Sequence, residues 1–194
     1  MVASLVILSG SSCAEKYPEV VRVCASSELG RGCGTGFFVS EDGYIVTAEH
    51  VVSYGEEDGM IYVIHSHYPH LKIAAEVMFT DATSDVAIIK ISGRGHRSIP
   101  ICEGSTIGDK IISIGLFDTG LEVAQGHVID FVGYYVQTTT VIRQGFSGGP
   151  MLDVENACVM GVNSRFHPIK KYALGVRLEA IQWAMDQIVH RFPG

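Results

Sequence analysis

Short apolar runs separated by turn-forming residues dominate the first half of the chain. Val, Ile, Tyr, Phe and Thr recur within these runs, a pattern typical of β-strands bounded by Gly, Pro, Asn, Asp or Ser. The runs occupy residues 20–25, 37–40, 44–47, 61–65, 71–79 and 86–91. The pattern therefore predicts about six strands before residue 92.

The strand pattern stops over residues 92–109, where glycines and a proline predict a connector, and then resumes. The second set of predicted strands covers residues 110–114, 121–131, 134–140, 157–163 and 172–176. The period then changes to three or four residues, which indicates one apolar helical face. That face consists of Leu178, Ile181, Met185, Ile188 and Phe192. Because this segment has no Lys/Arg face, we expect a helix that docks on the domain rather than on a membrane surface.

Two β halves followed by one helix predict an all-β fold of two packed antiparallel barrels. We expect a single domain over residues 1–194. Its expected parts are an N-terminal extension (1–15), a first barrel (16–96), a connector (97–109), a second barrel (110–177) and the helix (178–192). Residues 1–13 are apolar and then small but carry no Lys or Arg, so a weak export signal and an edge strand both stay open.

Composition narrows the functional classes. With 194 residues, 47% apolar and 18% charged, the chain is long and apolar enough to bury a core, which excludes disorder. The net charge of −7, with no Lys/Arg block, argues against a nucleic-acid partner. No apolar run reaches the 18 or more residues of a membrane helix, so we expect no integral membrane segment.

Five cysteines, at positions 13, 24, 33, 102 and 158, cannot all pair within one chain. None lies in a Cys-x-x-Cys spacing that would indicate zinc. A bridge from Cys24 to Cys33 and buried free thiols are both open alternatives.

A glycine-rich turn at residues 145–150, Gly-Phe-Ser-Gly-Gly-Pro, lies between strand-like runs. Glycines leave the backbone accessible, so a substrate carbonyl could approach it closely. Ser147 is then a candidate nucleophile, and the N–H groups of Gly145 and Ser147 are candidates for an oxyanion hole. Ser-Gly-Gly-Pro is also ordinary turn chemistry, so the motif needs partners.

A serine nucleophile needs a base and a carboxylate that orients this base. His50 lies towards the end of the segment 43–52. We expect it to terminate a strand, whose exposed end is a rigid mount for a catalytic group. Asp85 directly precedes the apolar run 86–91, so its carboxylate is expected to be half-buried at a strand edge. His50, Asp85 and Ser147 are therefore the predicted catalytic residues.

Three motifs occur in order: GTGFFVSEDGYIVTAEHVV, SDVAIIKI and QTTTVIRQGFSGGPML. Together they resemble the trypsin-like serine proteases, most closely the HtrA/Deg branch, over residues 17–188. The resemblance implies two six-stranded barrels with His50, Asp85 and Ser147 in the cleft between them. It implies a serine endopeptidase with polypeptide substrates as partners, no cofactor and no metal. It covers the protease domain only, without a PDZ-type module, and fixes no oligomeric state.

Two residues depart from this family. Glu49 replaces a small residue before the histidine, and we expect it to face away from His50 because neighbouring strand residues alternate. Phe146 replaces an Asn or Asp before the serine and must either pack apolarly or swing out. These departures motivate the alternative of a catalytically impaired, protease-like module that binds peptides.

The resemblance also implies which substrate side chains are preferred. Val141, six residues before Ser147, would lie at the base of the primary specificity pocket, which favours small or aliphatic side chains over Lys or Arg. Substrate would pair with the strand containing Gly161, Val162, Asn163 and Ser164. Arg165, just beyond it, could shift preference towards acidic residues.

A metal site formed by the histidines at 65, 67 and 70 is a weaker hypothesis than the protease, since no carboxylate or thiolate ligand is near them.

Relatives of this kind often act outside the cytoplasm, so an extracytoplasmic or periplasmic location is expected.

Overall fold

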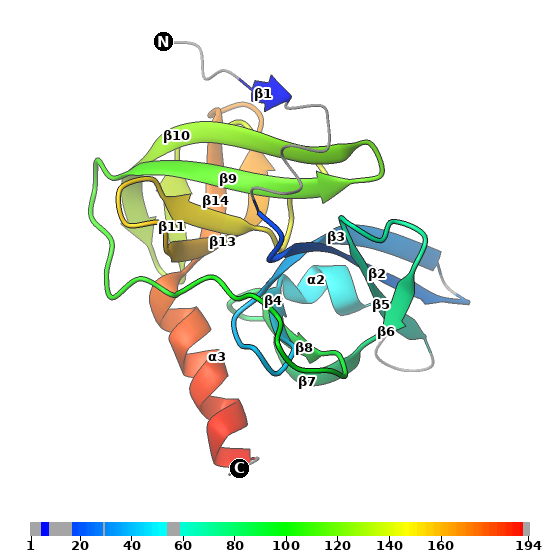
Figure 1. Cartoon of the computed structure of the whole chain (residues 1–194). Coiled ribbons are helices and arrows are strands. Elements are labelled where there is room, and N and C mark those ends of the chain that lie inside the picture. The colour runs from blue at the N-terminus through cyan, green and yellow to red at the C-terminus, as the bar shows by residue number, and fades with distance from the viewer. Residues whose placement is uncertain (1–4, 8–16, 29, 54–58, 192–194) are drawn as a thin grey trace.

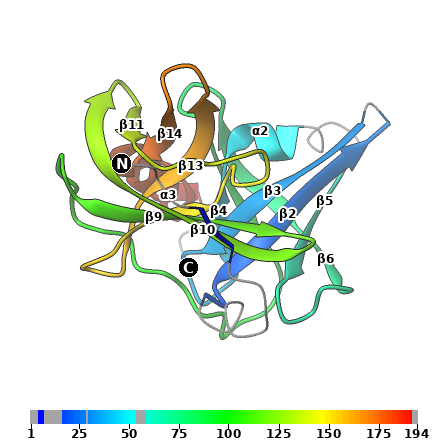
Figure 2. The same cartoon turned by 90° about the horizontal axis from the view of Figure 1, so that it is seen from above.

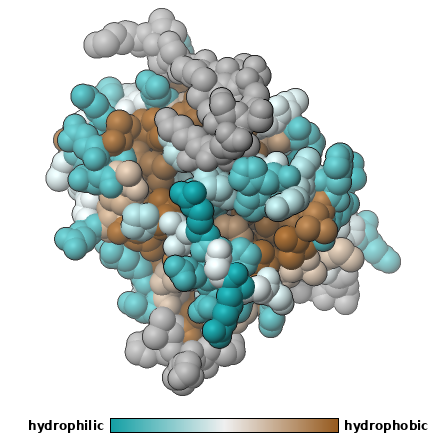
Figure 3. All heavy atoms as spheres, viewed as in Figure 1, coloured by the Kyte–Doolittle hydropathy of each residue, from teal (hydrophilic) through white to brown (hydrophobic). Residues whose placement is uncertain are grey.

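The computed structural model describes residues 5–7, 17–28, 30–53 and 59–191, and most of its regular structure is β (Figure 1). The strands form two lobes, and the helix α3 (Leu178–Arg191) follows the last strand. Figure 2 shows the lobes side by side, and β9 of the C-terminal lobe contacts β2 and β3 of the N-terminal lobe. Polar side chains cover much of both lobes on one face, with apolar residues exposed between them (Figure 3). No described helix is long and apolar enough to cross a bilayer.

The N-terminal lobe is an antiparallel sheet in the order β6-β5-β2-β3-β4-β8-β7. Its elements are β2 (Val20–Ser27), β3 (Gly30–Phe38), β4 (Tyr44–Thr47), α2 (Glu49–Val52), β5 (Met60–His65), β6 (Lys72–Ala74), β7 (Glu76–Asp81) and β8 (Val86–Lys90). The predicted strand 71–79 is in fact two strands, because β6 pairs with β5 whereas β7 pairs with β8. Ala75 lies between the two strands, and its N–H donates to the Ile61 carbonyl at 2.9 Å. Within the described residues no pairing joins β6 to β7, so this lobe is a curled seven-stranded half-barrel rather than the expected six-stranded closed barrel.

The C-terminal lobe is closed. Its strands are β9 (Lys110–Phe117), β10 (Gly120–Val132), β11 (Tyr135–Thr138), β12 (Pro150–Asp153), β13 (Val159–His167) and β14 (Tyr172–Arg177). β10 pairs with β9 through its first part and with β11 through its second, which closes these six described strands into a barrel. β1 (Leu5–Ile7) adds to β10 as an edge strand, the arrangement that one reading of the N-terminal segment predicted. The two-barrel fold class is therefore confirmed.

Two disulfides show how four of the five cysteines pair. Cys24 and Cys33 face each other on β2 and β3 and are bonded. Cys102 in the connector is bonded to Cys158, beside β13. The connector also pairs with β13, since the Cys102 N–H donates to the Val159 carbonyl at 2.9 Å. Cys13 lies outside the described residues.

Helix α3 packs on both lobes, as a docking helix should. It contacts β7 and β8 of the N-terminal lobe and β13 and β14 of the C-terminal lobe. Leu178, Ile181 and Ile188 are buried and Met185 is half-buried, while Phe192 lies outside the described residues. Ile181 shares one core cluster with residues of both lobes, so burial of its side chain stabilises their arrangement.

Candidate active site

His50 lies on a short helix, not at the end of a strand. Strand β4 ends at Thr47, and helix α2 begins at Glu49 after the extended residue Ala48. The helix is held by its buried Val51 and Val52, so the mount is still rigid. The expectation that Glu49 faces away from His50 assumed that both residues lie on a strand, and this premise is wrong. The His50 side chain is 47% exposed and so accessible to a ligand.

Asp85 is buried and points at His50. Its side chain is 4% exposed, and its Oδ1 lies 2.9 Å from Nδ1 of His50. The His50 backbone N–H also donates to Oδ1, at 3.2 Å, and the Ser164 hydroxyl donates to Oδ2. Burial raises the pKa of Asp85, but these hydrogen bonds outweigh it and hold the pKa below its usual value. A carboxylate at this position therefore stays ionised at neutral pH.

The turn before Asp85 explains how the carboxylate reaches His50. The Asp81 carboxylate accepts hydrogen bonds from the Thr83 N–H at 3.1 Å and from the Ser84 hydroxyl at 2.6 Å. These bonds fix a side-chain turn of the kind that Asp forms readily. Asp85 then adopts a left-handed backbone with φ of 60°, which Asp tolerates better than most residues.

Ser147 follows one tight turn and lies within a second. The first has a hydrogen bond from the Phe146 N–H to the Arg143 carbonyl at 3.1 Å and φ of 103° at Gly145, which makes it type II. The second links the Gly149 N–H to the Phe146 carbonyl at 2.9 Å. A side chain at Gly145 would lie 2.3 Å from the Phe117 ring, so only glycine fits there.

The Ser147 hydroxyl donates to the Ser164 carbonyl at 3.1 Å. Among the described residues no hydrogen bond joins it to the His50 ring. Ser164 therefore connects the three predicted catalytic residues, because its hydroxyl bonds to Asp85 and its carbonyl accepts from Ser147. In the part of the chain that the structure describes, the N–H groups of Gly145 and Ser147 have no acceptor and can bind one from a ligand.

Thr35 anchors the nucleophile turn, a function that the sequence did not reveal. Its buried hydroxyl donates to the Gly145 carbonyl at 2.7 Å and accepts from the Leu116 N–H at 2.9 Å. Its backbone N–H donates to the Ser147 carbonyl at 2.8 Å. The only signal in the sequence is a threonine between two glycines before the strand that leads to His50.

Phe146 packs apolarly, the first of its two expected alternatives. Its side chain is fully buried and meets the Phe117 ring edge-on, with ring centroids 5.5 Å apart. It shares a small core cluster with Ala124, Ile142 and Ala173. Apolar packing thus takes the place of the Asn or Asp that the resemblance led us to expect before the serine.

The predicted substrate strand is only partly accessible. Gly161 and Val162 lie between β12 and β14, and the Asn163 backbone bonds to Gly148 and Gly149, so none of these can pair with an added strand. Past Val162 no described strand covers the β12 side of β13. That edge begins at Ser164 and continues through Arg165 and Phe166.

Four further residues were singled out in the sequence: Val141 and Arg165 for substrate binding, and His65 and His67 for a metal. Val141 is 41% exposed, so it is available to a ligand. The Arg165 guanidinium lies 3.9 Å from the Asp85 carboxylate, which places a cation beside the group that binds His50. The rings of His65 and His67 stack 5.0 Å apart in the N-terminal lobe. Within the described residues no group of three or more His, Cys, Asp or Glu is arranged to hold a metal ion.

Comparison with known proteins shows similarity to serine proteases. The trypsin-like peptidase domain matches residues 34–162. A probable periplasmic DegP-like serine endoprotease from Chlamydia muridarum is 36% identical over 144 residues, which are 68% of this chain and 28% of that protein. The corresponding protein of Pseudomonas putida (strain W619) is 31% identical over 143 residues, 68% of this chain and 29% of its own. The chain thus spans less than a third of these relatives' length.

One solved structure extends the similarity to nearly the whole fold. The serine endoprotease from Yersinia pestis superposes with a TM-score of 0.79 at 26% identity. The alignment covers 95% of this chain and 68% of that one.

Proposed function

Because the chain belongs to the trypsin-like peptidase family, we propose that it is a serine endopeptidase that cleaves polypeptides through an acyl-enzyme. One observation carries the proposal: the buried Asp85 carboxylate lies 2.9 Å from Nδ1 of His50, and Ser164 links that carboxylate to Ser147. Three residue types required for serine catalysis are thus joined in one hydrogen-bonded group.

His50 is the general base. Since its Nδ1–H donates to Asp85, the other ring nitrogen, Nε2, carries the lone pair that can accept a proton. The Ser147 hydroxyl leaves the Ser164 carbonyl, gives its proton to Nε2, and its oxygen attacks the substrate carbonyl carbon. The imidazolium then gives this proton to the leaving amine, and water releases the acyl group by the same steps.

The Gly145 and Ser147 N–H groups form the oxyanion hole. Neither is engaged within the described residues, and the type II turn together with the Thr35 bond to the Gly145 carbonyl holds them in place. Donors that are fixed before the reaction stabilise the developing oxyanion without reorganisation.

Substrate pairs with the edge of β13 at residues 164–166 and inserts its side chain towards Val141. An apolar, accessible residue there offers no counter-charge to Lys or Arg, so small or aliphatic side chains are preferred. In a peptide library, dominance of Lys or Arg before the cleaved bond would contradict this preference.

The protein acts outside the cytoplasm. Two disulfides suit an oxidising compartment, and the relatives named above are described as periplasmic.

A non-catalytic peptide-binding module is the second candidate. It is favoured by the Ser147 hydroxyl, which bonds to the Ser164 carbonyl and not to His50. Casein and peptide cleavage by the wild type and by Ser147→Ala separates the two candidates. Catalysis predicts that the variant loses about 10⁴- to 10⁶-fold in turnover. Peptide binding without cleavage by the wild type would support the module instead.

A further inference from the structure

A pocket of about 310 Å³ lies beside the nucleophile turn, between β3 and the end of β9. Gly145 and Gly34 form part of its wall, and a side chain at Gly34 would lie 2.6 Å from the Ser147 carbonyl oxygen. In the proposed mode, substrate residues before the cleaved bond occupy the β13 edge. The residues after the bond therefore leave the site past Gly145 and reach this pocket.

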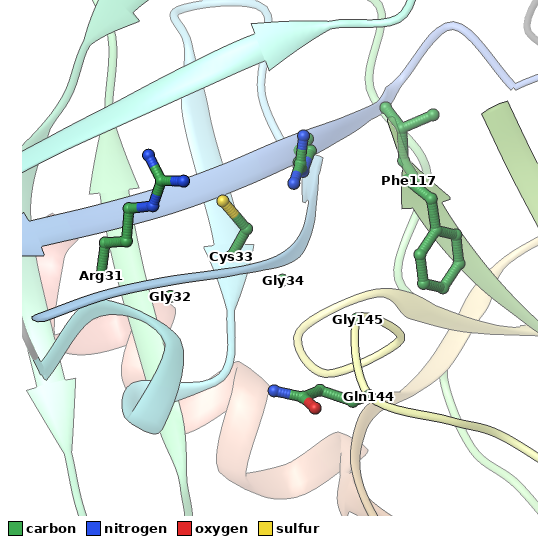
Figure 4. A pocket seen from close by; sticks show the side chains of 9 residues that line it. Arg31, Gly32, Cys33, Gly34, Phe117, Gln144 and Gly145 are labelled. Carbon is green, nitrogen blue, oxygen red and sulfur yellow. The ribbon is translucent and has the colours of Figure 1, made fainter. Parts of the chain in front are cut away.

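We propose that this pocket binds a side chain within the first two substrate residues after the cleaved bond and selects a carboxylate there. The inference rests on the proposed endopeptidase function. Figure 4 shows Arg31 and Cys33 on β3, with Gln144 and Gly145 on the neighbouring loop and Phe117 at one end.

The charge of the pocket is positive in a chain whose net charge is −7. Arg22 and Arg31 both line it, and the lining contains no Asp or Glu. Arg22 is paired with the exposed Asp118, outside the lining. Among the described residues no carboxylate pairs with Arg31, which is exposed. A guanidinium binds carboxylates through two parallel N–H donors, so an acidic side chain suits this pocket and a Lys side chain does not.

Two parts of the pocket wall, at Cys33 and Phe117, are held in place by bonded or packed partners. The disulfide from Cys33 to Cys24 ties β3 to β2 at the pocket. The Phe117 ring is held by Phe146 and by the Arg143 guanidinium, which lies 3.7 Å from the ring centroid. A binding group that is fixed beforehand loses little entropy when the ligand arrives.

The test uses C-terminally amidated peptides that share one cleavable sequence and carry Glu, Ala or Lys at the first or second position after the bond. Amidation restricts the carboxylate to the side chain, and a set with free C-termini shows whether a terminal carboxylate is bound as well. We expect kcat/KM to be about tenfold higher for Glu than for Lys at low salt, with the ratio falling as salt rises. Arg31→Glu should reverse the preference, and Asp118→Asn should increase it by releasing Arg22.

Arg94→Gln is the matched control, because Arg94 is 91% exposed and does not line this pocket; the wild-type ratio should remain. Equal rates for Glu and Lys peptides, with the Ala peptide cleaved, would overturn the subsite but leave the endopeptidase intact. Binding of the same peptides to Ser147→Ala separates the two failures. If no peptide is cleaved by the wild type while Glu peptides bind about tenfold more tightly than Lys peptides, the enzyme proposal fails and the subsite stands. Equal binding without any cleavage contradicts both.

Discussion

Two residues outside the predicted catalytic set organise the site. Thr35 and Ser164 each connect groups that are distant in the sequence: Thr35 bonds to Gly145 across 110 positions and Ser164 to Asp85 across 79. His50, Asp85 and Ser147 could be predicted because each lies in a recognisable local motif. The supporting hydroxyls could not, because a buried Thr or Ser has no local pattern that reveals its distant partner.

Replacing Thr35 with Val should lower both stability and turnover. The change leaves the Gly145 carbonyl and the Leu116 N–H without their buried partner, which costs about 1–3 kcal/mol. Because the Gly145 peptide is freed, we expect kcat to fall about 10- to 100-fold, with a smaller change in KM. Steady-state kinetics measure both, and Thr35→Ser, which keeps the hydroxyl, should restore most of kcat. Unchanged kcat in a folded Val variant would refute this anchoring role.

Replacing Ser164 with Ala should destabilise the protein in a pH-dependent manner. The folded pKa of Asp85 is lowered, so the stability from its hydrogen bonds is present above about pH 4 and is lost as pH falls through the folded value. Losing the Ser164 bond should cost about 2 kcal/mol at pH 6, and the deficit should shrink as pH falls through the folded pKa of Asp85. Urea unfolding between pH 2 and 7 measures this, with the exposed Ser98→Ala as control. A deficit independent of pH would show that Ser164 acts only through packing.

Among the elements, segments with an apolar pattern were predicted well, including the four-residue β4, whereas the glycine-rich first part of β3 was not. The pattern identified helix α3 and most strands, since their apolar faces repeat over many residues. It missed α2, which continues the apolar run of β4, and β12, which directly follows the glycine-rich turn. It joined β6 to β7, because the break between them depends on pairing with different strands, β5 and β8, which a local pattern does not reveal.

Ile181 tests the docking of α3. Its side chain is fully buried in a cluster that contains residues of both lobes. We expect Ile181→Ala to lower the free energy of unfolding by about 2–5 kcal/mol. The exposed Gln182→Ala should change it by less than about 0.5 kcal/mol. Similar urea midpoints for the two variants would mean that α3 contributes little to the core.

At the scale of the whole molecule, one closed barrel, one curled half-barrel and a helix that packs on both bring the site residues together. His50 and Asp85 come from the N-terminal lobe, whereas Ser147 and Ser164 come from the C-terminal lobe. The site therefore exists only when the lobes keep their arrangement. The two-lobe arrangement could be predicted from the order of the motifs. The closure of only one barrel could not, since strand patterns carry no information on which edges pair.

The disulfide from Cys102 to Cys158 should be the more stabilising of the two. It closes a loop with a sequence separation of 56, against 9 for Cys24 to Cys33. Chain entropy predicts a loss of about 4 kcal/mol when both cysteines of the longer loop become Ala, and about 3 kcal/mol for the shorter. Chemical denaturation of the two double variants under oxidising conditions gives the comparison. A larger loss from the shorter loop would argue against the entropic explanation.

Labelling with a fluorophosphonate tests the central claim most directly, because this reagent reacts with a serine hydroxyl that a neighbouring base activates. We predict one label per chain, located on Ser147 by peptide mass spectrometry, and a labelling rate reduced at least about 10³-fold in His50→Ala. A folded protein that stays unlabelled, or that labels equally well as Ser147→Ala, would contradict the account.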